Sequence, residues 1–384
     1  MHYIKTFLIA LTIAVISSTI YAKDLLVGTS VALTGKYSRT GQEQLNGLQM
    51  WIEDINKRGG LLGRKVTLRY YDDESKPETG AKLYEKLITN DRVELLVGPY
   101  SSSVTMAAST VAEKYGIPMI SSGASASEIW ERGFKNVFGL YTPANTYMDQ
   151  ILEFAKAKGL HRIALIYDNT EFPRDVANGV RIKAKALGMR IVFAEEYGKA
   201  STDFSSMIMK IRRSRPDVIL GGSYLPDSTA FMRQAKEYRL HAAIFAFAVG
   251  PGLPDFGKNL GRYANGVMGN TQWEPTLNLP GVKEFADRYQ AKYGTTPAYH
   301  AAGGYGSGQV LEAAVKQAGS IEPNAIRSAL SNLDIMTTFG RFKVDSAGKQ
   351  VGKPGYTIQW IKGKRHLILP STIATHLPLY PAPR

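Results

Sequence analysis

Short apolar runs alternate along this chain with longer stretches in which apolar residues return every three or four positions, the spacing of one helix face. The clearest such stretch is 42–57, and its apolar stripe consists of Leu45, Leu48, Ile52 and Ile55. Strands are expected at 25–31, 66–71, 95–97, 117–120, 163–167, 191–195, 218–220 and 244–247, and further helices at 77–89, 174–187, 204–213 and 228–238. This alternation predicts an α/β fold with parallel sheets covered by helices on both faces.

The alternation forms two blocks, before and after about residue 140, which indicates two similar lobes. A chain of 384 residues is also longer than one hydrophobic core normally serves. The last third of the chain departs from the alternation, because expected helices come first and short strands separated by glycines follow. These elements are 282–293, 301–317 and 324–330 as helices, and 341–344, 356–361 and 366–369 as strands.

Residues 1–22 have the pattern of a secretory signal peptide. Lys5 precedes an apolar stretch at 7–16, and small residues lead to a predicted cleavage site after Ala22. An uncleaved membrane anchor is the alternative, although the apolar stretch is short for a span. The chain has no cysteine, which excludes disulfides, thiolate metal sites and a cysteine nucleophile. An exported protein without disulfides fits a bacterial periplasm.

The net charge of +14 does not by itself predict a nucleic-acid or membrane partner, because lysines and arginines are dispersed along the chain. The densest basic run, 210–215, covers little more than one helix turn and is expected to face solvent. No histidines fall at metal-ligand spacing, and no GxSxG or phosphate-loop motif occurs. The glycines at 304–308 fit a closely packed helix better than a dinucleotide loop. We therefore expect no catalytic residue, no metal and no cofactor.

Residues 93–127 contain the most informative pattern. The strand at 95–97 stops at Gly98, and three serines (101–103) precede a helical pattern, as in an N-cap. The strand at 117–120 ends in a second small, hydroxyl-rich loop at 121–125. Ligands bind at the carboxyl ends of strands in open α/β sheets, and hydroxyls with helix N-terminal N–H groups bind anionic oxygens. The alternative is two ordinary capped turns of a doubly wound sheet.

These and other segments identify a resemblance that spans nearly the whole chain after residue 22. The chain resembles type I periplasmic substrate-binding proteins of ABC importers, in the branched-chain amino acid and amide group typified by the leucine/isoleucine/valine-binding protein. The resemblance rests on LLVGTSVALTGKYSRTGQ, LLVGPYSSSVTMAAS, YGIPMISSGASASE, ALIYDNTEFPRDVANGV, DVILGGSYLPDSTAFMRQAKE and FADRYQAKYGTTP, and on the stretch from Gly47 to Gly80.

The resemblance implies two Rossmann-like lobes joined by a three-strand hinge, with a small-molecule ligand in the cleft between them. The first lobe would comprise 23–141 and 276–334, and the second 142–275 and 335–384, with crossings near 141–146, 273–278 and 332–337. Closure around the ligand would present a surface to the permease subunits in the membrane. The protein would act as a monomer in the periplasm, without nucleic acid and without enzymatic activity. The same fold also occurs in ligand sensors that feed a receptor or regulator, which is the alternative function.

The resemblance also implies individual site residues. The hydroxyl that binds a ligand carboxylate falls on Ser102, and the neighbouring backbone donors fall on Gly123 and Ser125. The remaining candidates are Thr105 at the helix start, Tyr100 as a wall before the serine run, and two aromatic positions of the second lobe, at Phe172 and at Ser223 or Tyr224. For Phe172 and Tyr224, ordinary core or loop packing is the alternative.

The chain departs from this group where an α-ammonium would be bound. The second-lobe segment 245–253 contains no acid, and neither does the hinge-proximal segment 142–146. A desolvated ammonium without a partner costs several kcal/mol. The ligand is therefore expected to be an apolar or aromatic carboxylate or an amide, unless an amino acid holds its ammonium against tyrosine faces. On this interpretation the protein delivers a small organic solute to an ABC-type importer.

Overall fold

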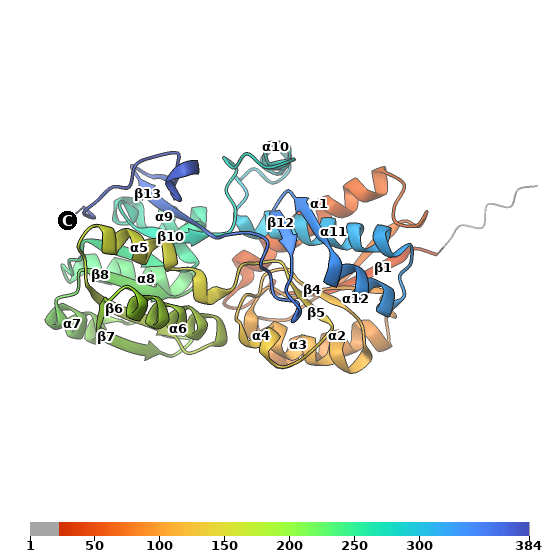
Figure 1. The fold of residues 1–384 in the computed structure, drawn as a ribbon, viewed down its shortest axis with the longest axis horizontal. Helices are drawn as coiled ribbons and strands as arrows, with labels where there is room; N and C mark the ends of the chain where they lie inside the picture. The colour runs from red at the N-terminus through yellow and green to blue at the C-terminus, as the bar shows by residue number, and fades with distance from the viewer. Residues whose placement is uncertain (1–22, 384) are drawn as a thin grey trace, which may run out of the picture.

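The structure is a computed structural model that describes residues 23–383, so the predicted signal peptide at 1–22 lies outside the described residues. Two sheets lie at opposite ends of the long axis of the molecule, each covered by helices (Figure 1). This is the predicted α/β fold with two lobes. Among the helices of residues 23–383, none is both long enough and apolar enough to cross a bilayer.

The first lobe contains a five-stranded parallel sheet with the order β2-β1-β3-β4-β5, an order typical of doubly wound folds. Its strands are β1 (Leu25–Val31), β2 (Val66–Asp72), β3 (Leu95–Val97), β4 (Met119–Ser121) and β5 (Val137–Gly139). Its helices are α1 (Ser38–Lys57), α2 (Pro77–Thr89), α3 (Ser102–Tyr115), α4 (Glu128–Glu131), α10 (Val282–Tyr293), α11 (Tyr299–Ala318) and α12 (Pro323–Asn332).

Helices α1 and α11, which are far apart in the sequence, pack closely against each other (Figure 1). Their backbones approach so closely that a Cβ on Gly47 would overlap the carbonyl of Ala301, and a Cβ on Gly304 would overlap the carbonyl of Gln44. Close packing therefore explains Gly304 in the glycine-rich run, as the sequence suggested.

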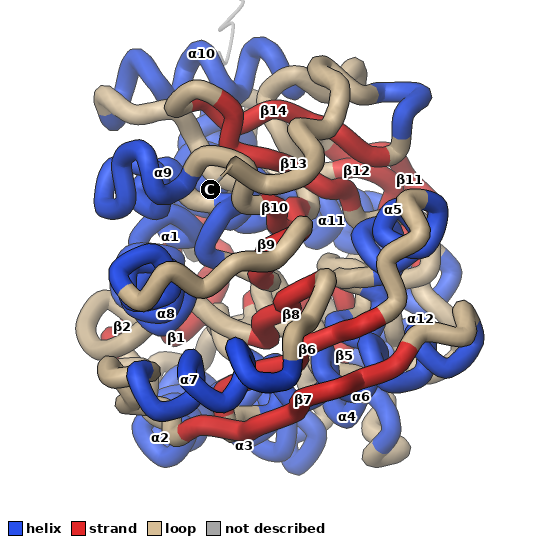
Figure 2. Tube along the Cα trace, turned by 90° about the vertical axis from the view of Figure 1, so that its left-hand side faces the viewer, coloured by secondary structure: helices blue, strands red, loops and turns tan. Residues whose placement is uncertain are grey.

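The second lobe contains a seven-stranded sheet with the order β14-β13-β10-β9-β8-β6-β7 (Figure 2). Five strands are parallel: β6 (Arg162–Asp168), β7 (Arg190–Tyr197), β8 (Val218–Gly222), β9 (Ile244–Phe247) and β10 (Met268–Thr271). Two antiparallel strands, β13 (Tyr356–Ile361) and β14 (Lys364–Leu369), extend it. The helices are α5 (Asp149–Ala157), α6 (Glu171–Ala186), α7 (Ser205–Ser214), α8 (Leu225–Glu237) and α9 (Pro254–Leu260).

The chain crosses between the sheets three times. The first crossing follows β5 and the second follows β10, near the positions predicted from the sequence. A buried hydrogen bond joins these two segments, since the hydroxyl of Thr142 donates to Oε1 of Gln272 at 2.9 Å. This bond holds the two crossing segments side by side.

The third crossing lies later than the predicted 332–337. At that position α12 ends and a hairpin of β11 (Asp334–Thr337) and β12 (Gly340–Lys343) begins, and β11 contacts α11 of the first lobe. The N–H of Gly139 then donates to the carbonyl of Gly348 at 2.7 Å. The crossing therefore lies between this contact and β13, because backbone pairing holds the hairpin on the first lobe. We keep the two-lobe division as a proposal, with this later crossing.

Candidate ligand-binding site

A cavity with about 260 Å³ of empty space lies between the two lobes. The first lobe lines it with the loops that follow β3 and β4 and with the start of α11, and the second lobe lines it with the loops that follow β6, β8 and β9. No Asp, Glu, Lys or Arg is among the lining residues. The lining residues are Tyr100, Ser101, Ser102, Gly123, Ser125, Tyr141, Tyr147, Phe172, Tyr224, Val249, Tyr299 and His300.

Ser101 and Ser102 form the polar end of the cavity. Ser101 is the N-cap of α3, and its Oγ accepts the N–H of Val104 at 3.2 Å, as the sequence predicted. The Oγ of Ser102 accepts the N–H groups of Ser125 at 3.3 Å and Ala126 at 3.2 Å. A hydroxyl has two acceptor sites and one donor, so both acceptor sites of Ser102 are used and its proton is left to donate.

Backbone N–H groups add to the donors at this end. The N–H groups of Ser102 and Gly123 have no hydrogen-bond acceptor within residues 23–383. Ser102 is the first residue of α3, where the helix dipole favours an anion. Gly123 packs so closely that a Cβ would lie 2.7 Å from the carbonyl oxygen of Tyr100, which only glycine avoids. The cavity therefore offers several donors to a carboxylate or amide oxygen.

The backbone N–H of Ser125 does not have the ligand-binding role that was predicted. Its N–H is bonded to Ser102 and is not free to bind a ligand, because it holds the two loops together. Its Oγ accepts the hydroxyl of Tyr147 at 3.1 Å, which again leaves a hydroxyl proton to donate. Ser125 thus contributes a side-chain donor to the cavity where a backbone donor was expected.

Aromatic rings form the walls of the cavity. The ring of Phe172 lies 5.4 Å from that of Tyr147 and 5.4 Å from that of Tyr224, by centroid distance, in the second lobe. On the side of the first lobe, the ring of His300 lies 5.2 Å from Tyr100 and stacks on Tyr299 at 3.9 Å. Such tilted and stacked pairs are favourable aromatic arrangements.

His300 is neutral in this setting. It is buried, and burial lowers the pKa of its imidazole well below the usual value. Its Nδ1 has no hydrogen-bond partner among the described residues. The cavity therefore contains aromatic surface, hydroxyls and neutral ring nitrogens, but no charged side chain.

Six of the eight residues predicted from the sequence line this cavity: Tyr100, Ser102, Gly123, Ser125, Phe172 and Tyr224. Thr105 does not line it, and its hydroxyl donates to the carbonyl of Pro99 at 3.4 Å. Of the two alternatives at the second aromatic position, Tyr224 lines the cavity and Ser223 does not. Ligand binding by these residues stays a prediction.

Sequence reasoning missed the lining residues Tyr141, Tyr147, Val249, Tyr299 and His300. Tyr141 belongs to the predicted first crossing, which is the only sequence signal that could have identified it. Tyr299 and His300 begin α11, more than a hundred residues further along the chain, and no local pattern distinguishes them from packing residues.

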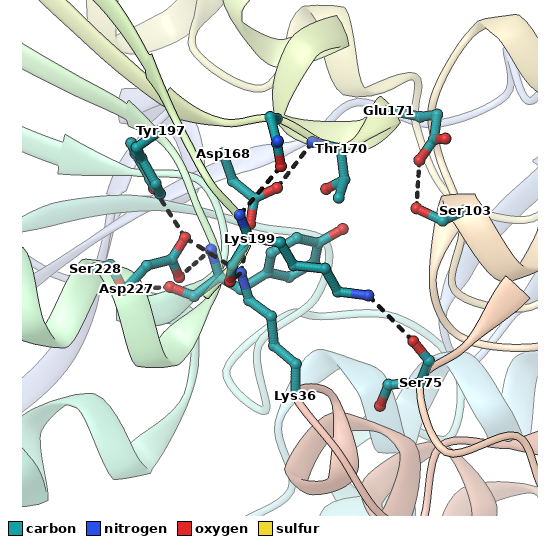
Figure 3. Close-up of polar contacts among 12 residues, drawn as sticks. Lys36, Ser75, Ser103, Asp168, Thr170, Glu171, Tyr197, Lys199, Asp227 and Ser228 are labelled. Atoms are coloured by element: carbon teal, nitrogen blue, oxygen red, sulfur yellow. Dashed lines mark hydrogen bonds and ion pairs between the residues drawn. The ribbon is translucent and has the colours of Figure 1, made fainter. Parts of the chain in front are cut away.

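Two buried acids lie close to the cavity, although the segments searched in the sequence contained none. Asp168 ends β6, and Asp227 lies in the first turn of α8. Asp227 accepts the N–H of Tyr224 at 2.9 Å, and burial raises the pKa of its carboxyl to about 6. Both acids contact Lys36 of the first lobe, as Figure 3 shows. They stand behind Tyr224 and do not line the cavity.

Comparisons with known proteins agree with this architecture. The sequence model of the family described as "Periplasmic binding protein" matches residues 25–365. A curated relative, Leu/Ile/Val-binding protein homolog 7 of Brucella suis, is 28% identical, and the match covers 96% of this chain and 97% of the relative. These matched proteins are solute-binding proteins and not enzymes, as expected from the sequence.

Two solved structures share the fold. The substrate-binding protein of a branched-chain amino acid transporter from Streptococcus pneumoniae, in complex with isoleucine, has a TM-score of 0.82 and 23% identity, covering 90% of this chain and 99% of that one. A solute-binding protein of an ABC transporter from R. palustris, in complex with benzoate, has a TM-score of 0.80 and 21% identity, covering 94% and 97%.

Proposed function

The chain belongs to the periplasmic binding protein family, and from this premise we propose that it binds a small apolar or aromatic carboxylate, or an amide, and delivers it to an ABC importer. The observation that carries the proposal is the composition of the cavity, which combines oxygen-binding donors with aromatic walls and has no charged side chain. In this role the protein acts in the periplasm as a monomer, with the permease subunits of the importer as partners.

The absence of charge from the lining argues against a free amino acid. An α-ammonium taken out of water needs a carboxylate partner, and an unpaired buried charge costs several kcal/mol. Two acids behind the cavity wall, Asp168 and Asp227, are already paired with Lys36. A carboxylate, in contrast, has the hydroxyl of Ser102 and the N–H of Gly123 as donors, and these support an anionic oxygen at that end.

The walls of the cavity favour a ligand with apolar or aromatic surface, because the rings of Tyr147, Phe172 and Tyr224 line it. The similar solved structures hold one ligand with an ammonium, isoleucine, and one without, benzoate. The uncharged lining of this cavity supports a ligand of the second kind.

Identification of the bound solute tests this proposal. Protein purified from its native host is denatured, and the released small molecules are analysed by mass spectrometry. A released carboxylate or amide without an amino group supports the proposal, and a branched-chain amino acid contradicts it. N-terminal sequencing of the exported protein tests the location, since cleavage of the signal peptide predicts a first residue at Lys23.

A further inference from the structure

Lys36 reaches from the first lobe into the second. It lies in the loop between β1 and α1, and its Nζ contacts the carboxylate of Asp168 and donates to the carbonyl of Lys199 at 3.0 Å (Figure 3). The same Nζ lies 3.7 Å from Oδ2 of Asp227. The side chain of Lys36 is 12% exposed and those of the two acids at most 2%. An ion pair between the lobes is therefore almost fully removed from water.

The second lobe fixes both carboxylates without help from Lys36. Asp168 accepts the N–H of Thr170 at 2.8 Å, and Asp227 accepts the hydroxyl of Tyr197 at 2.8 Å. Their strands are neighbours, since β6 pairs with β8, which leads into α8. Among the described residues, Lys36 is the only lysine or arginine within ion-pair distance of either acid. The second lobe thus holds a prepared acidic site, and the first lobe supplies its cation.

This ion cluster lies directly behind the cavity wall. The Nζ of Lys36 is 5.1 Å from the centroid of the Tyr224 ring, and Tyr224 lines the cavity. The ring of Tyr37, next to Lys36, lies 4.7 Å from Tyr224 and 5.7 Å from Tyr100. Lys36 and Tyr37 therefore connect walls that belong to different lobes.

We propose that Lys36 is a positioning residue: a tethered ammonium that occupies the acidic site of the second lobe and so holds the lobes closed around a ligand that has no ammonium of its own. The closing role stands on the contacts alone, and the link to ligand class rests on the proposed function. A buried carboxylate pair without a cation is strongly unfavourable. Without Lys36, the closed arrangement of the lobes should therefore be much less stable relative to the open one.

Rescue by an external amine tests this role. The variant Lys36→Ala removes the ammonium and leaves a space between the lobes, and propylammonium chloride supplies a matching cation. Refolded, ligand-free protein is compared at one fixed pH by its thermal midpoint, with potassium chloride as the salt control. We expect propylammonium to raise the midpoint of Lys36→Ala and to leave that of the wild type unchanged.

Lys199→Ala is the matched control. The Nζ of Lys199 also connects the lobes, since it donates to the carbonyl of Ser75 at 3.2 Å (Figure 3). No carboxylate of residues 23–383 forms an ion pair with it. Propylammonium should therefore not stabilise Lys199→Ala. An equal effect of the amine on both variants, or none on Lys36→Ala, overturns the proposal.

Calorimetric titration with benzoate as the probe tests the link to the cavity. Lys36→Ala should bind benzoate at least about tenfold more weakly, as expected when one partner of a buried charge pair is truncated, and propylammonium should restore part of the affinity. Unchanged benzoate affinity in Lys36→Ala overturns the link. If the wild type does not bind benzoate but the amine still stabilises Lys36→Ala selectively, the ligand class is wrong and the tethered ammonium stands.

A second set of variants covers a failure of Lys36→Ala to fold. Lys36→Met keeps the aliphatic stem, and Asp168→Asn removes one carboxylate. Each should weaken benzoate binding, and the double variant should be no weaker than the worse single variant, because both changes break the same contact. Additive losses contradict the proposal. In a wild type that binds no benzoate, the same cycle is measured on the thermal midpoint.

Discussion

The Oγ of Ser102 accepts the backbone N–H of Ser125 at 3.3 Å, which joins the loops that follow the neighbouring strands β3 and β4. The serines predicted as separate ligand contacts therefore form one unit. Because the acceptor sites of Ser102 are occupied by the protein, its proton remains for the ligand.

Ser102→Ala should weaken carboxylate binding by about 1–3 kcal/mol, since a charged acceptor loses a donor. The same change leaves the N–H groups of Ser125 and Ala126 without an acceptor, so the unliganded protein should also lose stability. This loss of stability follows only from the structure, because these two bonds have no sequence signal. Calorimetric titration and urea unfolding measure the two effects.

Thr105→Val is the control for this variant. Thr105 follows the same serine run but does not line the cavity, so its replacement by a residue of similar shape should leave benzoate affinity unchanged. If Thr105→Val weakens binding as much as Ser102→Ala, the assignment of the donor end to Ser102 is wrong.

Strands such as β1 and β3 could be identified from the sequence because each begins with the apolar run Leu-Leu-Val. Strand β10 was missed because it reads Met-Gly-Asn-Thr, although all four residues are buried in the sheet. The side-chain amide of its Asn270 is satisfied by a partner that only the fold provides, since it donates to the carbonyl of Tyr147, 123 positions away in the sequence, at 3.4 Å. Hydrophobic pattern cannot identify a strand of buried polar residues.

Phe172→Ala should lower the free energy of unfolding by about 3–5 kcal/mol, because the side chain is 5% exposed and its loss leaves a void. The enlarged cavity should also shift preference from benzoate toward a larger acid such as 2-naphthoate. The ratio of the two affinities is the measurement.

Phe231→Ala gives the comparison for Phe172. Phe231 is 1% exposed but does not line the cavity, so its truncation should reduce stability without changing the affinity ratio. A ratio that shifts equally in both variants would mean that Phe172 acts only through the core.

Asp73 should make stability depend on pH. It is buried, and burial raises the pKa of its carboxyl to about 6. In the unfolded chain an aspartate releases its proton near pH 4, so between about pH 4 and 6 the folded state binds more protons and stability falls as pH rises. Asp73→Asn removes this penalty.

Relative to the wild type, the free energy of unfolding of Asp73→Asn should therefore rise by up to about 3 kcal/mol between pH 4 and pH 7, because the pKa of this aspartate is about 6 in the folded state and about 4 in the unfolded chain. Urea unfolding at a series of pH values measures the difference. Parallel stability curves for the two proteins would exclude a raised pKa at Asp73.

Gly304→Ala should destabilise the first lobe by about 1–3 kcal/mol, because the added methyl group meets the carbonyl of Gln44 where α1 and α11 touch. Helix propensity alone predicts the opposite sign, a gain of about 1 kcal/mol for alanine over glycine. A rise in the urea midpoint would show that α1 and α11 can move apart without a loss of stability.

The site was predictable where it is local and unpredictable where it is assembled from distant segments. Ser102 and Gly123 lie in the two loops that the strand-end pattern indicated, and the family resemblance assigned them individually. The contact between Lys36 and Asp168 joins residues 132 positions apart, and neither residue differs locally from a solvated charge. A search restricted to 245–253 and 142–146 could not find acids that the topology of β6 and β8 brings to the cleft.

The central claim is that the cavity binds an acid without an α-ammonium. Two matched ligand pairs test it most directly: leucine against 4-methylpentanoate, and phenylalanine against 3-phenylpropanoate, which differ only in the ammonium. After co-purified ligand is removed by unfolding and refolding, each affinity is measured by calorimetry. Thermal shift gives an independent check, since a ligand at a hundredfold excess over its Kd stabilises by about 2.7 kcal/mol. We predict that the deaminated acid of at least one pair binds more tightly than its amino acid; tighter binding of both amino acids would contradict the account.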